Sequence, residues 1–483
     1  MDYKFKTEPY EHQLQALGAS HNKENFALLM EMGTGKSKVL VDNIAMLYDK
    51  GKIDSALIIA PKGVYRNWEK QEIPIHLPDH VKHQMIIWSP SKTKKQEKEL
   101  NKLFKHEEEL MIFIMNIEAF STKRGTEMAE KFLLSHHCLM AIDESTTIKS
   151  TTASRTKNIL KIRKLAKYRR ILTGSPVTKS PLDLFTQCYF LDPYLLDFQS
   201  YYSFKSRYAV LKRQHMGSHS FDQIVGYQRL DELNHKLNQF SFRVLKKDCL
   251  DLPEKVYTKR YVTMTTEQNQ IYDQMKNHAL SHLKTGEVVT AASALAQMIK
   301  LHQITCGHIT TDLEEHDIRI QEIPHNRINV LKEALQEVDG KIIIWATYIH
   351  DIQKIKETLQ EEYGVNSVET FFGGTASDDR QEIVGKFQDM DSELRFLVAN
   401  PRVGGYGLTL TASHTVIYYS NNYDLEVRMQ SEDRAHRIGQ VNKVTYIDLM
   451  VEKTVDELII KSLRNKINLA SQVLGEEFKK WLV

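Results

Sequence analysis

The sequence predicts an α/β protein with two lobes, each a parallel sheet flanked by helices, and mainly helical insertions between the lobes. Three observations lead to this fold class. The chain has 483 residues, more than one hydrophobic core usually serves. Two stretches alternate short apolar runs with helical patterns, which is typical of parallel strands joined by crossover helices. The segment between them is rich in Lys, Gln, His and Tyr and has a helical pattern.

The first lobe is predicted to span residues 1–193, the insertions 194–326 and the second lobe 327–483. Expected strands of the first lobe are Phe26–Met30, Ala56–Ala60, Met111–Met115, Leu139–Ile142 and Arg170–Leu172. Those of the second lobe are Lys341–Trp345, Ser367–Phe371, Phe396–Ala399, Thr415–Tyr419 and Thr445–Leu449. Between the lobes, a packed helix is predicted from residues that have the i, i+3, i+4 spacing: Leu295, Met298, Ile299, His302 and Gln303.

Composition argues against several classes of protein. The formal net charge is +3, so any affinity for nucleic acid must come from local basic surface. The four cysteines form no C-x-x-C pair, which argues against a zinc ribbon and a disulfide framework. The first residues lack the apolar core of a signal peptide, and no apolar run approaches the length of a membrane helix. We therefore expect a cytoplasmic monomer with no membrane partner.

The segment LLMEMGTGKSKVLVDNIAMLYD has the pattern of a strand, a glycine loop and a helix. Its phosphate-binding core consists of Gly33, Thr34, Gly35, Lys36 and Ser37. Glycines let backbone N–H groups close around phosphate oxygens, Lys36 supplies charge to the β- and γ-phosphates, and Ser37 can ligand Mg²⁺. Met30 stands where the general pattern has another glycine. The context predicts an ATP-binding loop rather than only a helix N-terminus.

An acidic pair ends an apolar strand in CLMAIDESTTIKS, about a hundred residues after this loop. Asp143 can hold Mg²⁺ through its water shell, and Glu144 can orient and deprotonate the attacking water. Phosphoryl transfer also needs positive charge at the γ-phosphate. Arg434 and Arg437 in QSEDRAHRIGQ have the i, i+3 spacing of one helix face and are candidate arginine fingers. The alternative is a solvated basic helix face.

Together these segments resemble the Swi/Snf-type family of chromatin-remodeller ATPases and their microbial relatives, within helicase superfamily two. The resemblance covers nearly the whole chain. It rests on YEHQLQAL, ALIIAPKGVYRNWEKQ, DEST, LTGSPVTKSPLDLF, KIIIWATY, FFGGTASDDRQEIVGKF, VANPRVGGYGLTLTASHTVIYYSNNYD and, most specifically, RMQSEDRAHRIGQ. The family's second motif usually reads D-E-G-H or D-E-A-H, whereas Ser145 and Thr146 stand here. Thr146 is a candidate to replace the histidine, which is thought to help couple the phosphate site to motif III.

The resemblance implies two RecA-like lobes and ATP-driven movement along double-stranded or branched DNA, with ATP and Mg²⁺ as cofactors. It assigns adenine recognition to Gln13 and a nucleotide contact to Gly405. The candidate DNA-phosphate contacts are Lys62, Asn116, Thr173, Thr347, Arg402 and Thr409. Phosphate contacts carry no sequence information, so we expect weakly selective, salt-sensitive binding. The D-E-S start resembles the annealing-helicase branch, which makes fork remodelling, annealing or branch migration one version of the function.

Two further features have competing interpretations. The basic run RTKNILKIRKLAKYRR is either a DNA-facing surface or, as we favour, a solvated amphipathic helix with Ile159, Ile162 and Leu165 inward. We interpret the segment that carries His302, Cys306 and His308 as packed structure rather than a metal site. For the whole chain, the alternatives to a duplex-DNA translocase are a single-strand DNA or RNA helicase and a nucleotide-gated DNA-binding scaffold.

Overall fold

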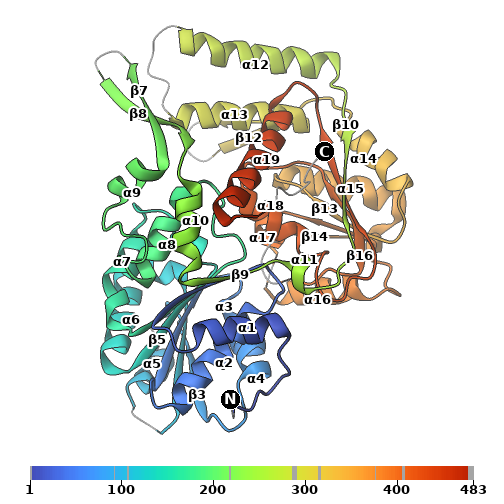
Figure 1. The fold of residues 1–483 in the computed structure, drawn as a ribbon. Coiled ribbons are helices and arrows are strands. Elements are labelled where there is room, and N and C mark those ends of the chain that lie inside the picture. The colour runs from blue at the N-terminus through green and yellow to red at the C-terminus, as the bar shows by residue number, and fades with distance from the viewer. Residues whose placement is uncertain are drawn as a thin grey trace. The chain divides into compact units, whose positions relative to one another are not determined.

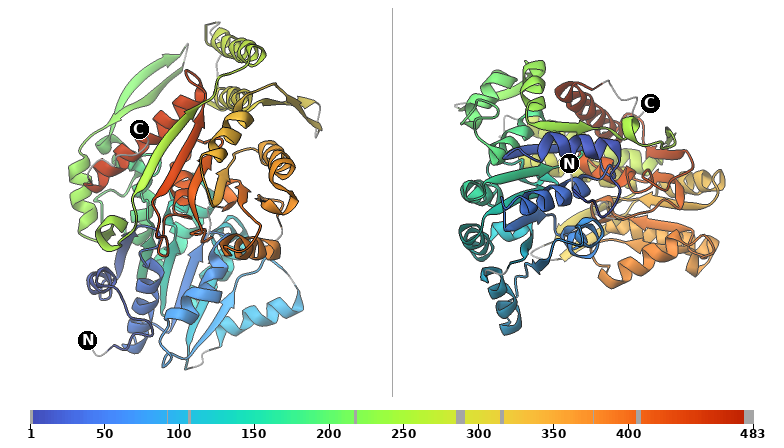
Figure 2. Two further views of the ribbon diagram at one scale, coloured as in Figure 1. Left: turned by 90° about the vertical axis from the view of Figure 1, so that its right-hand side faces the viewer. Right: turned by 60° about the horizontal axis from the view of Figure 1, so that its bottom comes forward.

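The computed structural model describes residues 3–91, 93–105, 108–216, 219–284, 291–313, 317–375, 377–404 and 408–476. The chain divides into two compact units (Figure 1). The first consists of Met1–Asp251 together with Lys466–Lys479, and the second consists mainly of Leu252–Asn465. Figure 2 gives two further views of the elements. Among the described helices, none has the length and apolar character needed to cross a membrane.

The first unit is built on a seven-stranded sheet in which every neighbouring pair is parallel. Its order is β3 (His83–Ile87), β4 (Leu110–Asn116), β2 (Ser55–Ala60), β5 (Cys138–Asp143), β6 (Tyr168–Leu172), β1 (Asn25–Met30) and β9 (Ser241–Val244). The five strands predicted for this lobe are therefore confirmed, while β3 and β9 were not predicted.

Both faces of this sheet are covered by helices, which is why its central strands are largely apolar rather than alternating. Leu57 and Ile59 of β2 belong to one core, with α6 (Lys123–Ser135), α7 (Ser154–Ile162) and α8 (Leu184–Leu191). Ala56 and Ile58 face the other core, with α1 (Glu11–Ser20), α2 (Lys36–Asp49) and α4 (Ile73–His76). The site described below lies on the edge between these layers, where the strands end.

The second unit has a six-stranded sheet, again parallel at every pair. Its order is β10 (Lys255–Tyr261), β17 (Val444–Met450), β16 (Ser413–Tyr418), β13 (Lys341–Trp345), β15 (Phe396–Ala399) and β14 (Val368–Phe371). Helices α14 (Arg327–Gln336) and α15 (Ile349–Tyr363) pack on one face, and α16 (Ser377–Gln388) packs on the other. All five predicted strands are confirmed, as is the α/β class with two RecA-like lobes.

The segment 194–326 contains strands as well as the predicted helices. The helices are α9 (Tyr201–Tyr208), α10 (Leu230–Asn238), α11 (Lys246–Cys249), α12 (Thr266–Lys284) and α13 (Ala291–Cys306). The described part of this segment also contains two antiparallel hairpins: β7 (Ala209–Met216) with β8 (His219–Tyr227) lies between α9 and α10, and β11 (His308–Leu313) with β12 (Asp317–Glu322) follows α13. Strand β9 forms an edge of the first large sheet, and strand β10 forms an edge of the second. Strand β10 is mostly exposed. Edge strands of this kind need no continuous apolar run, so the pattern did not reveal them.

Candidate nucleotide-hydrolysis site

Five neighbouring strands of the first sheet deliver the predicted site residues to one edge. The carboxyl ends of parallel strands meet at the same edge of a sheet, which is where such folds place their ligands. The phosphate loop follows β1, Thr173 follows β6, Asp143 ends β5, Lys62 follows β2 and Asn116 ends β4. The side chain of Lys62 is exposed, and the Asn116 amide donates to Glu118 Oε2 at 2.9 Å.

The phosphate loop is a tight turn that leads directly into α2. Gly33 and Gly35 have φ of 82° and 88°, a left-handed conformation that side chains rarely adopt. Gln13 Nε2 donates to the Thr34 carbonyl at 3.1 Å. The same atom would lie only 2.1 Å from a Cβ placed on Gly35. Gln13 thus closes over the loop, and its role in adenine recognition stays a prediction.

Lys36, Asp143 and Glu144 are brought together where α2 begins and β5 ends. Lys36 Nζ lies 3.9 Å from Glu144 Oε1, and both side chains are largely buried. Asp143 Oδ2 accepts a hydrogen bond from the Trp68 indole at 3.0 Å, and Oδ1 accepts one from the Glu144 backbone N–H at 3.0 Å. Burial raises the pKa of Asp143, while the Lys36 charge and the Trp68 hydrogen bond oppose that rise.

Glu144 has an unusual backbone conformation. Its φ of 50° is left-handed, which is strained for a residue with a side chain. Such strain persists only where the surroundings enforce it, and it is concentrated at functional sites. Thr173 Oγ1 lies 3.5 Å from Glu144 Oε2, a long hydrogen bond that joins the residue after β6 to the acidic pair.

The structure connects the unusual second motif to motif III through Ser145. The Ser145 hydroxyl is fully buried and donates to Gln187 Oε1 at 2.7 Å. The Gln187 amide in turn donates to the Pro176 carbonyl at 2.9 Å and the Asp183 carbonyl at 2.8 Å. The sequence had pointed to Thr146, which is also buried. The position before it therefore carries a connection that the sequence did not predict.

Strand β9 and helix α11 bring further residues to the phosphate loop. The Arg243 guanidinium donates to the carbonyls of Leu29 at 3.0 Å and Gly174 at 2.8 Å, and pairs with Glu476 at 2.7 Å. The Lys246 backbone N–H donates to Glu31 Oε2 at 2.8 Å. The sequence reasoning missed both residues, because nothing local marks a contact made across about two hundred positions.

The oxygen donors at this edge fit a magnesium ion. Mg²⁺ prefers carboxylate and hydroxyl oxygens together with substrate phosphates. Asp143 ends β5 as a carboxylate, and each of its oxygens accepts one of the hydrogen bonds described above. Ser37 supplies a hydroxyl in the first turn of α2. The residues that would hold the ion are thus Ser37 and Asp143.

In the second unit, the two candidate arginine fingers are not on a helix. Helix α18 (Leu425–Glu432) ends before them, so the prediction that Arg434 and Arg437 share a helix face is wrong. In the turn that follows, the Arg434 carbonyl accepts from the Leu410 N–H at 3.0 Å. Both guanidinium groups instead donate to the Leu408 carbonyl, at 3.2 and 3.1 Å. Arg434 is buried, whereas Arg437 is partly exposed.

The remaining candidate DNA contacts of this unit follow strands β13 and β15. The Thr347 N–H donates to Ser420 Oγ at 2.9 Å, and its carbonyl accepts from the Asn400 amide at 2.8 Å. Arg402, in α17 (Pro401–Gly404), is largely exposed and lies 3.5 Å from the Asp424 carboxylate. Thr409 is partly buried, and Gly405 lies outside the described residues.

The basic run has two parts with different surroundings. Ile159 and Ile162 of α7 are buried, as the amphipathic interpretation predicts, and Leu165 is half-buried. The exposed lysines of the run are Lys157, Lys161, Lys164 and Lys167. Arg170 is fully buried and donates to the carbonyls of Ser20, Lys23 and Glu24, so it serves the fold rather than a surface.

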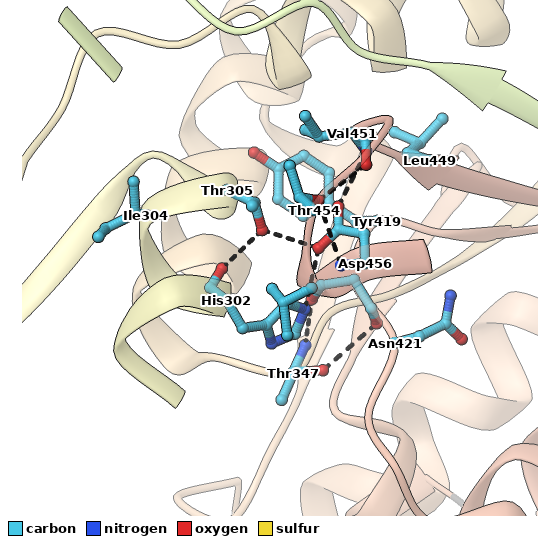
Figure 3. A network of polar contacts seen from close by, with 12 residues as sticks. His302, Ile304, Thr305, Thr347, Tyr419, Asn421, Leu449, Val451, Thr454 and Asp456 are labelled. Carbon is cyan, nitrogen blue, oxygen red and sulfur yellow. Dashed lines mark hydrogen bonds and ion pairs between the residues drawn. The ribbon is translucent and has the colours of Figure 1, made fainter. Parts of the chain in front are cut away.

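His302 belongs to a buried polar network around Asp456 (Figure 3), whereas His308 Nδ1 lies 3.0 Å from Asp351 Oδ1. The Thr305 hydroxyl donates to Asp456 Oδ1 at 2.8 Å, and His302 Nε2 lies 3.8 Å from the same oxygen. Arg327 forms an ion pair with Asp456 and donates to the Leu449 carbonyl at 3.1 Å. In the described part of the chain, no group of three or more His, Cys, Asp or Glu is placed to hold a metal ion.

Two family models match the chain. A model described as SNF2-related domain matches residues 12–309, and one described as Helicase conserved C-terminal domain matches residues 326–439. The first match includes every candidate residue of the first unit's site, from Gln13 to Thr173. The second includes Thr347, Arg402, Arg434 and Arg437.

Several relatives align with almost all of the chain. An uncharacterized ATP-dependent helicase, MG018 of Mycoplasma genitalium, is 27% identical over 92% of this chain and 40% of its own length. The putative ATP-dependent helicase/translocase YwqA of Bacillus subtilis is 26% identical over 92% and 46%. The chromatin structure-remodeling complex subunit snf21 of Schizosaccharomyces pombe is 26% identical over 96% and 39%. The chain thus spans less than half the length of these relatives.

Among solved structures, the Sulfolobus solfataricus SWI2/SNF2 ATPase core in complex with dsDNA matches at 23% identity. The match covers 98% of this chain and 94% of that chain. Its TM-score is 0.43, too low for the two folds to be compared element by element.

Proposed function

Because the chain belongs to the SNF2-related family, we propose that it is an ATP-hydrolysing motor that moves along double-stranded or branched DNA. One observation supports this most directly. Lys36, Asp143 and Glu144 meet at the carboxyl edge of one parallel sheet, with Lys36 Nζ 3.9 Å from Glu144 Oε1. A phosphate-binding lysine beside an acidic pair is the central part of what phosphoryl transfer to water requires.

Each residue of the site has a distinct task in the proposed reaction. The N–H groups of Gly33 to Ser37 and the Lys36 charge bind the phosphates. Asp143 and Ser37 hold Mg²⁺, which supplies positive charge against the phosphate oxygens when bound. Glu144 orients the attacking water and accepts its proton, and its left-handed backbone fixes where the carboxylate points. Gln13 closes the loop on the base side.

The remaining candidates are assigned to stabilising the charge of the transition state and to binding the DNA backbone. The residues that bind the backbone form the proposed DNA track. Arg434 and Arg437 supply positive charge at the γ-phosphate. The DNA backbone is contacted by Lys62, Asn116, Thr173, Thr347, Arg402 and Thr409. Contacts to phosphates give affinity without reading sequence, so the motor can step along any duplex.

ATPase rates measured with duplex, branched and single-stranded DNA and with RNA, over a range of salt, test the proposal. We expect duplex or branched DNA to stimulate most. Stimulation mainly by single strands or RNA would favour a conventional helicase instead. Equal rates with and without nucleic acid would contradict the motor.

Replacing Glu144 with Gln separates turnover from binding. The substitution keeps the size and shape of the side chain but removes its charge and its capacity to act as a base. We expect ATP to bind as before and turnover to fall by roughly 10²–10⁴-fold. A variant with wild-type turnover would remove Glu144 from the mechanism. A wild-type chain that binds ATP without hydrolysing it would support the nucleotide-gated scaffold.

We further propose that movement, rather than strand separation, is the primary output, with fork remodelling, annealing or branch migration as its consequence on branched substrates. What supports this is the family resemblance together with the D-E-S start of the second motif. Displacement of a third strand from a duplex reports movement alone, whereas release of one strand from a forked duplex reports unwinding. We expect the first and not the second.

A further inference from the structure

Trp68 is buried in the first unit beside the proposed metal-binding carboxylate. Its side chain is 1% exposed, and its indole N–H donates to Asp143 Oδ2 at 3.0 Å. The two residues are 75 positions apart, one after β2 and one at the end of the adjacent strand β5. An indole has one donor and no acceptor, so this hydrogen bond is all that its polar atom can make.

The backbone around Trp68 is irregular. Trp68–Glu72 form a π-helical turn between the short helices α3 (Tyr65–Asn67) and α4. The Ile73 N–H donates to the Trp68 carbonyl, five residues back. π-Helical turns are rare in proteins, but those that occur are often found at functional sites. The same segment begins at Pro61 and carries the exposed side chain of Lys62, a proposed DNA contact.

We propose that Trp68 is a positioning residue through which the segment 61–72 sets the orientation of the Asp143 carboxylate. When Lys62 contacts a DNA phosphate and the segment shifts, the indole moves with it and changes the geometry offered to the metal ion. This connection rests on the proposed function. It gives DNA a direct route to the rate of ATP hydrolysis.

The hydrogen bonding of Asp143 supports this role. Oδ1 is held by the Glu144 N–H and Oδ2 by Trp68, so each oxygen has one donor that fixes the carboxylate plane. The first donor is backbone at the acidic pair itself. Only the second comes from a different segment. Partners of metal-binding carboxylates typically change metal affinity by about 10–100-fold when they are removed.

The variant Trp68→Phe tests the proposal, because phenylalanine keeps a buried aromatic ring and loses only the N–H and the second ring. Mn²⁺ replaces Mg²⁺ as the probe, and its binding to the ADP-bound protein is followed by electron paramagnetic resonance. We expect the Mn²⁺ dissociation constant to rise by about tenfold or more. We also expect the ratio of DNA-stimulated to basal ATPase rate to fall.

The matched control is Trp88→Phe. Trp88 is also buried in the first unit, with Arg124 over its ring at 5.4 Å. The two variants should lose similar stability, but only Trp68→Phe should weaken Mn²⁺ binding. In an Asp143→Asn background, the Trp68→Phe substitution should weaken Mn²⁺ binding no further.

Three results would overturn the proposal. An unchanged Mn²⁺ dissociation constant in Trp68→Phe would reduce Trp68 to core packing. A further loss of Mn²⁺ affinity in the double variant would make its effect independent of Asp143. Weakened Mn²⁺ binding with unchanged DNA stimulation would remove the connection to the DNA contact. If no DNA stimulates the wild-type ATPase, the proposed function fails, while the Mn²⁺ measurements still decide whether Trp68 positions Asp143.

Discussion

At the scale of single residues, the phosphate loop shows how backbone conformation and packing select one side chain. Gly35 has a φ of 88°, and the space beside its Cα is filled by the Gln13 carboxamide. The same carboxamide donates to the Thr34 carbonyl, one position earlier. A change at either residue therefore acts on the peptide units that would face the phosphates.

Replacing Gly35 with Ala is expected to abolish tight ATP binding. The methyl group would require Gln13 to move and would hold alanine in a strained conformation at a cost of about 1–3 kcal/mol. ATP affinity measured by calorimetry, together with urea unfolding, checks both effects. In Gln13→Ala/Gly35→Ala the clash is removed but the strain is not, so partial recovery of the free energy of unfolding is expected, without recovery of ATP affinity. Wild-type affinity in the single variant would contradict this account of the loop.

Arg434 and Arg437 share one acceptor, but Arg434 is expected to add a structural role to its proposed charge at the γ-phosphate. Arg434 is buried and also donates to the Gln430 carbonyl at 3.0 Å, which ties the turn to α18. Arg437 is the more exposed of the two. We expect Arg437→Ala to lower kcat by roughly 10³-fold or more, as loss of an arginine finger does, with little change in the free energy of unfolding.

Arg434→Ala is the contrasting variant. It removes the donor from two carbonyls, which should lower the free energy of unfolding by about 1–3 kcal/mol. Steady-state ATPase rates and chemical denaturation of both variants separate the two roles. Wild-type kcat in Arg437→Ala would exclude it as a finger.

The sequence predicts those parts of the site whose residues are close together in the chain. The phosphate loop and the acidic pair lie in short segments, and their residue types indicate phosphate and metal binding. Trp68 and Gln187 carry no such mark, since each acts on a partner 75 or 42 positions away. The order of the strands and the packing of the helices and turns that follow them bring those partners together. Neither was available from the pattern of apolar runs.

At the scale of helices and strands, central and edge strands differ in how well the sequence reveals them. Nine of the ten predicted strands lie inside the sheets and are largely buried, whereas β14 (VETF) was predicted although it forms an edge of the second sheet. Strand β10 pairs with β17 alone among the described strands, and its sequence KVYTKRY has four polar residues among seven and no continuous apolar run. Side-chain contacts also hold β10 in place. Lys255 Nζ lies 3.1 Å from Glu432 Oε2, and the Tyr257 hydroxyl donates to the same oxygen at 2.7 Å.

The charge on Glu432 is expected to make the stability of the second unit depend on acid pH. Burial would raise the pKa of Glu432, but the charges of Lys255 and Arg428 outweigh it and lower the pKa to about 2. A lowered pKa means that the stabilisation is complete above the ordinary value near 4.5 and is lost as pH falls toward 2. For this buried group the contribution at neutral pH is on the order of 3 kcal/mol.

Urea unfolding of wild type and Glu432→Gln between pH 7 and pH 2 measures this contribution directly. We expect the variant to be less stable at pH 7 and the difference to shrink steadily below about pH 4.5. Glu254→Gln is the matched control, since Glu254 pairs with Lys443 at 2.9 Å but is largely exposed. It should change stability by less than about 1 kcal/mol. A constant difference between wild type and Glu432→Gln at all pH values would contradict the assignment.

At the scale of the whole molecule, the chain is nearly neutral for its size. With a formal net charge of +3, binding to DNA cannot rest on a general attraction. In the proposed function it rests on local contacts, of which Lys62 and Arg402 carry the positive charges. The exposed lysines of α7 give a useful contrast, because they are equally basic and lie outside the proposed track.

Salt dependence should separate these two groups of lysines. Each phosphate that a cation neutralises releases counterions, so the logarithm of the association constant falls linearly with the logarithm of salt concentration. Lys62→Ala should weaken binding to duplexes of different sequence alike and reduce the slope by about one. Lys157→Ala should leave the slope unchanged, because its side chain is solvated away from the track. Fluorescence anisotropy between about 50 and 200 mM salt gives both slopes. An equal reduction in the two variants would make the basic face of α7 part of the DNA-binding surface and would require the proposed track to be redrawn.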